Sequence, residues 1–194
     1  MKNLKKMGVS AMLLVTMNAF ANDGSKVSGL YQNVNDFVSN KITYQIDCNS
    51  KTDFINPDAV FKASKIVIKE NGKKYTVAKS GFFGYVDCDN NAYRFYGNEA
   101  YEILDAAGFY LYKRTFNVSN GKGSQRVTAY YFSKDGSSSL QLLTKQNLES
   151  EYASNTSFRY ALESAFHDDN ELTAYDSYLK CFKVKHIFNE STKK

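Results

Sequence analysis

Apolar and polar residues alternate in short runs through the middle of the chain, and turn residues separate the runs. Residues 65–70 and 74–78 alternate in this way, and Asn71-Gly72 lies between them. Asn-Gly between two alternating runs is the strongest short-range signal for a β-hairpin, because both turn residues tolerate a positive φ. The pattern therefore predicts two antiparallel strands that are joined at Asn71-Gly72.

The same alternation continues to Leu143, with many aromatic and β-branched residues between turn signals. Such spacing is typical of an antiparallel meander and not of alternating βαβ units. We therefore expect residues 65–143 to form an antiparallel sheet of at least six strands. An earlier strand is expected at 42–47, and the later ones are expected at 82–88, 92–96, 101–104, 109–116, 127–133 and 140–143.

Helical signals flank this region on both sides. Asn33 is a suitable N-cap for a short helix over 33–39, whereas the polar segment 49–58, which holds the only proline, reads as a loop. Thr144 is a suitable N-cap for a helix that ends at Tyr152.

Two more helices are expected towards the C-terminus. Asn155 or Thr156 can cap a helix that carries Phe158, Leu162 and Phe166 on one face. We expect this face to pack on the sheet. A start resembling a capping box at 168–171 then predicts a helix to residue 182, followed by a polar tail over 189–194.

These elements predict an α+β fold with an antiparallel meander at about 42–143 and a helical part at about 145–182 that packs on it. The meander is expected to be strongly curled, or closed into a barrel-like form. The sequence shows no interdomain linker and no internal repeat, so we expect residues 22–194 to form a single domain.

The first 21 residues have the pattern of a signal peptide. Three lysines among the first six residues precede a mostly apolar run over 7–20, and Ala19-Phe20-Ala21 supplies the small residues of a cleavage site. We expect cleavage after Ala21 and export to the periplasm or the extracellular space. A lipid anchor would need a cysteine next to the cleavage site, where the sequence has Asn22.

The charge and hydropathy of the mature chain limit the kinds of partner that we expect for it. Three of the 25 Lys and Arg residues lie in the leader, so 22 basic residues face 20 acidic ones after cleavage. This near balance, without a basic run, gives no reason to expect a nucleic acid partner. No second apolar run approaches the roughly 18 residues of a transmembrane helix, so we expect no transmembrane segment in the mature chain.

The chain has three cysteines, and an exported protein can form disulfides. Cys48 and Cys88 share a local context, because each follows a strand-like residue and an aspartate. If any pair is bridged, these two are favoured. The alternative is three buried thiols that act as small hydrophobic residues.

The best candidates for a ligand-facing surface are Tyr93, Arg94 and Tyr96. On a strand over 92–96, Arg94 and Tyr96 share one face, while Tyr93 and Phe95 share the other. Arg94 could reach an anionic or sugar ligand beside an aromatic platform. The alternative is cross-strand aromatic packing with a solvated arginine.

Catalytic and metal-binding patterns are weak in this sequence. Cys88 with His167 is the only thiol–imidazole pair worth testing for a hydrolase, and His186 lies in a basic segment. The cysteines and histidines fit no zinc spacing, and the phosphate-loop and G-x-S-x-G patterns are missing. We therefore expect no catalytic residue, no metal ligand and no cofactor.

Several short motifs give the chain a resemblance to a known group of proteins. They are Ser28-Gly29-Leu30-Tyr31, Asp36-Phe37, 81–88, Tyr93-Arg94-Phe95-Tyr96, Tyr101-Glu102-Ile103-Leu104, Tyr130-Tyr131-Phe132-Ser133 and Leu143-Thr144. In the order of these segments, the chain resembles uncharacterised exported proteins of Bacteroidetes-type bacteria. The resemblance implies a setting in the bacterial envelope, and it brings no assigned activity or catalytic residue.

Three functions fit these observations. The first is a non-catalytic binding protein of the bacterial envelope, with a protein, a glycan or a small apolar molecule as its ligand. The second is an envelope hydrolase whose active-site residues are scattered along the chain. The third is a structural or assembly subunit of a surface complex, for which a long exposed edge strand would be evidence.

Overall fold

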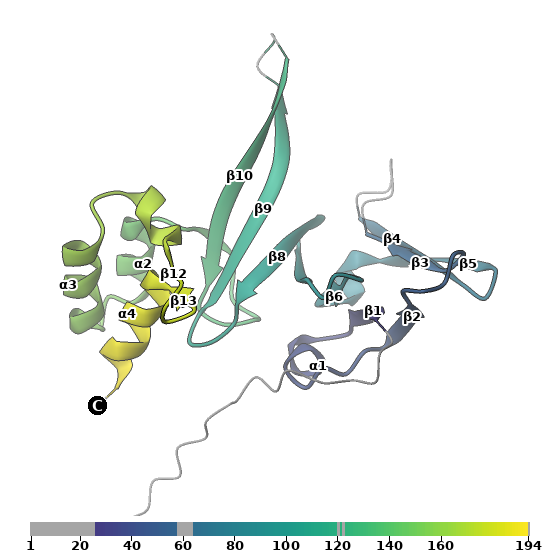
Figure 1. Cartoon of the computed structure of the whole chain (residues 1–194), viewed down its shortest axis with the longest axis horizontal. Helices are drawn as coiled ribbons and strands as arrows, with labels where there is room; N and C mark the ends of the chain where they lie inside the picture. The colour runs from purple at the N-terminus through teal and green to yellow at the C-terminus, as the bar shows by residue number, and fades with distance from the viewer. Residues whose placement is uncertain (1–25, 58–63, 120, 122, 194) are drawn as a thin grey trace, which may run out of the picture.

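The computed structural model describes residues 26–57, 64–119, 121 and 123–193. The expected signal peptide and its cleavage site lie outside the described residues. The described chain has an α+β fold in which antiparallel strands come first and most of the helices follow near the C-terminus (Figure 1). None of its helices has the length and apolar character needed to cross a membrane.

The largest element is an eight-stranded sheet with the order β11-β10-β9-β8-β7-β6-β1-β2, in which every pair is antiparallel. Within the described chain β2 and β11 are its two edges, so the sheet is open and the barrel-like form is wrong. Its strands are β1 (Val27–Tyr31), β2 (Tyr44–Asp47), β6 (Gly84–Val86), β7 (Ala92–Tyr96), β8 (Glu99–Asp105), β9 (Tyr110–Ser119), β10 (Ser124–Ser133) and β11 (Gln141–Leu142).

A second sheet has the order β3-β4-β5, with β3 at Phe54–Asn56, β4 at Lys65–Glu70 and β5 at Lys73–Ala78. The predicted hairpin is confirmed, because Asn71 and Gly72 join β4 to β5 with φ values of 51° and 74°. The expectation of one sheet over 65–143 was wrong, because β4 and β5 pair apart from β6–β11. The expected loop over 49–58 contains β3, whose Ile55 packs against the core beneath this sheet.

A testable prediction follows from the positive φ of Gly72. Gly72→Val should lower the free energy of unfolding by about 1–2 kcal/mol, because a β-branched residue is strained in the left-handed region. Gly123→Val is a matched control, since Gly123 is exposed, has room for a side chain and lacks a positive φ. Equal urea midpoints for the two variants would show that Gly72 is not needed for this turn.

The predicted helix N-termini at Asn33, Thr144 and Asn155 are confirmed. Each side-chain oxygen accepts a hydrogen bond from the backbone N–H three residues later, at 3.0–3.1 Å. These bonds satisfy N–H groups that have no partner inside the helix. The helices that begin there are α1 (Val34–Val38), α2 (Lys145–Glu151) and α3 (Thr156–Ala165).

The continuous helix predicted from Asp168 to residue 182 was wrong. A 3₁₀ turn over Asp169–Thr173 is followed by a small hairpin of β12 (Tyr175–Asp176) and β13 (Cys181–Phe182). The hairpin forms because the Asp176 carboxylate accepts the backbone N–H groups of Tyr178 and Leu179, at 2.9 Å each, which closes a turn.

Helix α4 covers Lys183–Thr192, so residues 189–192 of the expected polar tail are helical. Its Val184 and Phe188 are buried in the main core. Lys185 is buried on the same helix, where its ammonium group lies 3.4 Å from Asp105 and donates to the carbonyl of Phe109. Burial lowers the pKa of Lys185 to about 8.

Two hydrophobic cores lie on the same face of the large sheet, here called the covered face. Tyr85, Tyr93, Glu102 and Lys113 are cross-strand partners across β6–β9, so their side chains share this face. Leu111, two residues before Lys113, is on it too. Helices α2–α4 cover one end of this face and the β3–β5 sheet covers the other (Figure 1).

The predicted packing of α3 is confirmed. Phe158, Leu162 and Phe166 are buried in a core that includes Phe109 and Leu111. The other core joins β4 to strands β1, β2, β6 and β7, and its buried members are Leu30, Ile46, Ile66, Ile68, Tyr85 and Phe95.

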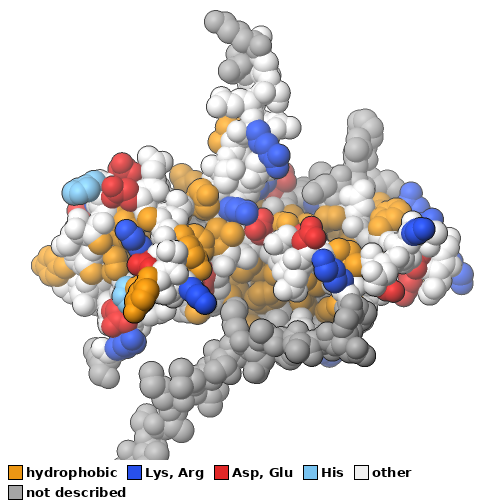
Figure 2. All heavy atoms as spheres, viewed as in Figure 1, with side chains coloured by type: hydrophobic (Ala, Val, Ile, Leu, Met, Phe, Trp, Pro, Cys, Tyr) orange, Lys and Arg blue, Asp and Glu red, His pale blue; other side chains and the backbone are white. Residues whose placement is uncertain are grey.

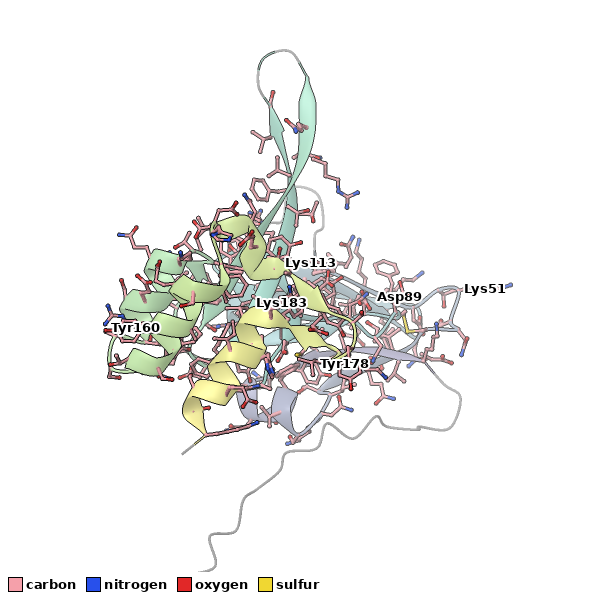
Figure 3. All side chains as sticks on the ribbon, turned by 60° about the vertical axis from the view of Figure 1, so that its left-hand side comes forward. Lys51, Asp89, Lys113, Tyr160, Tyr178 and Lys183 are labelled. Carbon is pink, nitrogen blue, oxygen red and sulfur yellow. A yellow bond between two sulfur atoms is a disulfide. The ribbon has the colours of Figure 1, made fainter. Side chains whose placement is uncertain are left out.

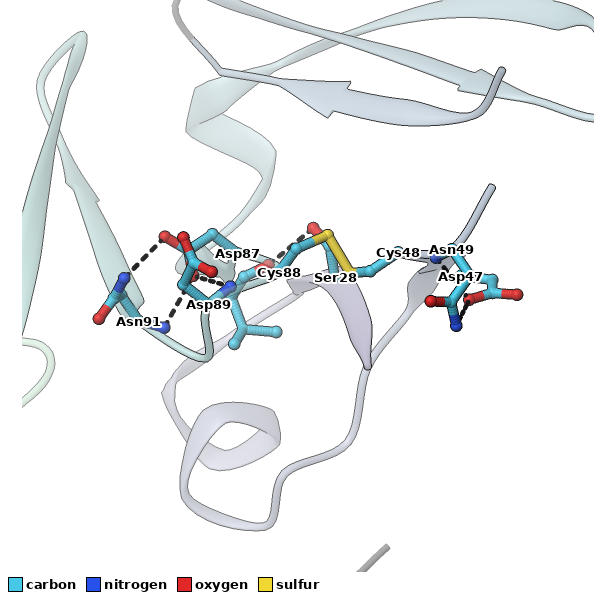
Figure 4. Close-up of a disulfide and its surroundings, with 9 residues drawn as sticks. Ser28, Asp47, Cys48, Asn49, Asp87, Cys88, Asp89 and Asn91 are labelled. Atoms are coloured by element: carbon cyan, nitrogen blue, oxygen red, sulfur yellow. Dashed lines mark hydrogen bonds between the residues drawn. A yellow bond between two sulfur atoms is a disulfide. The ribbon is translucent and has the colours of Figure 1, made fainter. Parts of the chain in front are cut away.

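Cys48 and Cys88 form a disulfide with a Cα–Cα distance of 5.6 Å, as the sequence favoured (Figure 4). The bridge joins the end of β2 to the turn after β6, the two strands that flank β1. In each case the preceding aspartate makes the turn, because Asp47 accepts the N–H of Asn49 at 2.9 Å and Asp87 accepts that of Asp89 at 2.9 Å. The repeated Asp-Cys context thus marks two turns that bring the thiols together.

Candidate functional site

The three candidate ligand-facing residues do not form one site. Tyr93 lies on the covered face, whereas Arg94 and Tyr96 lie on the opposite face of β7, which we call the α1 face. The alternation along the strand is the one expected from the sequence. The candidate residues therefore belong to two separate regions, one on each face of the sheet.

On the covered face, Tyr93 lines a cleft of about 390 Å³ over β6–β10. Its ring stacks on Tyr85 at 4.5 Å, and its hydroxyl donates to Asp87 at 3.2 Å. Burial, with the nearby Asp87 charge, raises the pKa of Tyr93 above its usual value, so the hydroxyl stays protonated.

The charges in this cleft are mostly paired. Lys113 contacts Glu102 at 2.8 Å, and Arg114 contacts Glu99 at 2.7 Å. Arg126, on β10, is exposed and has no ion-pair partner in the described chain. The cleft is therefore a polar surface with most of its charge already neutralised, and among the described residues that line it Arg126 is the one cation without an ion-pair partner.

On the α1 face, Arg94 is the central residue, and its side chain is only 5% exposed. Its Nη1 donates to the hydroxyls of Tyr112 at 3.0 Å and Ser133 at 3.1 Å, and its Nη2 donates to the carbonyl of Ser138 at 2.8 Å. The guanidinium thereby ties β7 to β9, to β10 and to the loop after β10. The solvated arginine considered as the alternative is wrong.

Aromatic rings surround the same guanidinium. The rings of Phe83, Tyr96 and Tyr112 have their centroids 5.6–5.9 Å from Arg94 Cζ. Such contacts stabilise a cation that has lost part of its water. Tyr96 is 39% exposed, so its ring also presents a surface to solvent.

No carboxylate of the described chain lies within ion-pair distance of Arg94. Asp135 is the acidic residue nearby, and one of its carboxylate oxygens accepts the backbone N–H groups of Ser137 and Ser138, at 2.7 Å each. These hydrogen bonds, with a smaller contribution from the Arg94 charge, hold the pKa of Asp135 below its usual value. Arg94 is thus a buried cation without a direct counterion, which is costly in a protein interior.

The guanidinium also has N–H groups that donate no hydrogen bond within the described chain. Of its five N–H groups, the three hydrogen bonds above use three, which leaves one on Nη2 and the Nε–H. Arg94 lines a depression of about 310 Å³ between the loops that precede α1 and β6 and the loop that follows β10. Among the described residues around this depression, Arg94 is the only charged one.

The residues considered for catalysis do not come together. Cys88 is bound in the disulfide, so it cannot serve as the thiolate of a thiol–imidazole pair. His167 is exposed, and its backbone N–H donates to Glu171. Cys181 is half-buried without a disulfide, and His186 is half-buried on α4. Within the described ranges no cluster of three or more His, Cys, Asp or Glu could hold a metal.

Sequence reasoning missed the residues that hold Arg94 in place. Tyr112 and Ser133 are 18 and 39 residues away from it along the chain, and no sequence motif links either of them to Arg94. The strand register brings them to the α1 face, so a correct register prediction was the only signal that could have found them.

Comparison of the chain with protein-family models, with curated proteins and with solved structures gives no match.

Proposed function

We propose that this protein is an exported, non-catalytic binding protein of the bacterial envelope that recognises a carboxylated sugar through Arg94 and Tyr96. The observation that carries the proposal is the buried guanidinium of Arg94, which has two unused N–H donors and no carboxylate partner in the described chain. A ligand carboxylate would supply the missing countercharge.

The chemistry of arginine favours this class of ligand. A planar guanidinium matches a carboxylate with parallel hydrogen bonds, and Arg94 is already held in place by three bonds to the protein. A preorganised side chain loses little entropy when the ligand binds. The exposed ring of Tyr96, which touches the same guanidinium, offers a platform for the apolar face of a sugar ring.

The disulfide supports the exported setting. Disulfides persist in oxidising compartments and are rare in the cytosol, and Cys48–Cys88 joins the turn after β2 to the turn after β6. The same bridge removes the one cysteine that was considered as a nucleophile, which weakens the hydrolase alternative.

The proposal is tested with trigalacturonate as the probe and neutral galactotriose as its uncharged counterpart, both measured by calorimetry. Only the acidic sugar should bind. Arg94→Lys should weaken binding at least about tenfold, because an ammonium group cannot make the paired hydrogen bonds. Tyr96→Ala should weaken it about fivefold through the lost ring contact.

Two controls separate binding from folding and from net charge. Tyr96 is partly exposed, so its replacement tests the site even if Arg94→Lys lowers stability. Arg159→Gln removes an exposed positive charge on α3 and should leave binding unchanged. Equal binding of the neutral sugar would exclude recognition through Arg94, and cleavage of the acidic sugar would favour the hydrolase.

A further inference from the structure

The β9–β10 hairpin extends well beyond the sheet to which it belongs (Figures 1 and 3). The two strands pair with each other over ten positions, whereas β8 pairs only with residues 111–113 of β9. On the other side, β11 pairs only with residues 131–132 of β10. The outer edge of β10 over 124–129 therefore has no neighbouring strand in the described chain.

The direction of the backbone groups on this edge follows from the pairing with β11. The Leu143 N–H donates to the carbonyl of Tyr130 at 2.9 Å, so the polar backbone groups of Tyr130 point outwards. In an antiparallel strand this direction alternates with every residue. Arg126 and Thr128 therefore also present their N–H and C=O groups outwards, as a free template for another strand.

The charge of the hairpin selects the partner. Residues 110–133, from the start of β9 to the end of β10, contain four Lys or Arg residues and no Asp or Glu. On β9, Lys113 and Arg114 are neutralised by glutamates of β8. On β10, Arg126 is exposed and has no ion-pair partner in the described part of the chain. Figure 2 shows basic side chains where the hairpin stands clear of the body.

We propose that the outer edge of β10, residues 124–129, binds an extended acidic segment of a partner protein by strand addition. The partner's backbone would continue the sheet, and an Asp or Glu of the partner would pair with Arg126. Val127 points to the other face, where it is half-buried opposite Phe116, so a β-branched residue fits beside it. The matching sequence alternates acidic and β-branched residues.

A second copy of this chain is a poor occupant of the same edge. Two such edges would bring two uncompensated Arg126 side chains to one seam, and like charges disfavour that pairing. The proposal rests on the hairpin alone and is independent of the site at Arg94.

The test measures the fluorescence anisotropy of a labelled peptide of about ten residues in which Glu and Val alternate, a usual length for a strand. A Lys-Val peptide is the matched control. The full mature protein should bind only the acidic peptide. Arg126→Glu should weaken this binding at least about tenfold by charge repulsion.

Thr128→Pro should have a similar effect, because it removes an outward N–H and leaves the β9 ladder intact. Arg159→Glu, a charge reversal at an exposed position on helix α3, is the matched control and should change the affinity less than about twofold. Tyr96→Ala should not affect peptide binding, and Arg126→Glu should not affect trigalacturonate binding, so the two proposals can fail separately.

Three results would overturn the proposal. They are binding of the Lys-Val peptide with equal affinity, binding of the acidic peptide that Arg126→Glu leaves unchanged, and a concentration-dependent dimer that Arg126→Glu abolishes. The last result would assign the edge to a second copy. If Thr128→Pro fails to fold, the Arg126→Glu measurement alone decides.

Discussion

Removing the disulfide should lower the free energy of unfolding by about 3–4 kcal/mol. The bridge closes a loop with a sequence separation of 40 residues, and loop-closure entropy predicts a gain of this size for the cross-linked chain. The loop contains the β3–β5 sheet, so the cross-link also holds the base of that layer against β1, β2 and β6. Urea unfolding of the Cys48→Ser/Cys88→Ser double variant measures the effect.

Two controls define this result. Cys181→Ser should leave the unfolding midpoint almost unchanged, because Cys181 forms no disulfide and is only half-buried. Reduction of the wild-type protein should reproduce the loss seen in the double variant. A double variant as stable as the wild type would show that the bridge does not constrain the unfolded chain.

The elements that the sequence predicted well are those whose signals are local. Asn71-Gly72 needs only its own backbone preference, and Asn33 and Thr144 need only an N–H three residues away. The disulfide belongs to this group, because Asp47 and Asp87 shape the turns beside the two cysteines.

The secondary-structure predictions that were wrong concern segments whose local sequence pattern fits more than one structure. Leu172, Tyr175 and Leu179 have helical spacing, yet the Asp176 carboxylate stabilises a turn between them. Strand β1 was not predicted, because Gly29 weakens the strand signal. The structure needs that glycine, since a Cβ there would collide with Ile42 and with the carbonyl of Tyr44.

The candidate site was predictable only in part. The two-residue period of a strand was enough to separate Tyr93 from Arg94 and Tyr96. The burial of Arg94 was not predictable, because it depends on Ser133, Tyr112 and the carbonyl of Ser138, which are distant in sequence. The sequence pattern alone is equally compatible with a solvent-exposed Arg94. In the structure Arg94 is instead the one charged residue that lines the depression, within the part of the chain that the structure describes.

The packing of α3 on the sheet makes the second large prediction. Leu162→Ala should lower the free energy of unfolding by about 3 kcal/mol, because Leu162 is fully buried and its loss leaves a cavity. The cavity would lie in the core that contains Leu111 and Phe132, which anchor the base of the β9–β10 hairpin. Urea unfolding measures the loss.

Tyr160→Ala is the matched control for this change. Tyr160 lies on the same helix and is 72% exposed, so its replacement should change the free energy of unfolding by less than about 0.5 kcal/mol. Equal stabilities for the two variants would mean that α3 does not pack on the sheet in solution. Because Leu111 and Phe132 pack in the same core as Leu162, Leu162→Ala should also increase hydrogen exchange at these two residues, which Tyr160→Ala should leave protected.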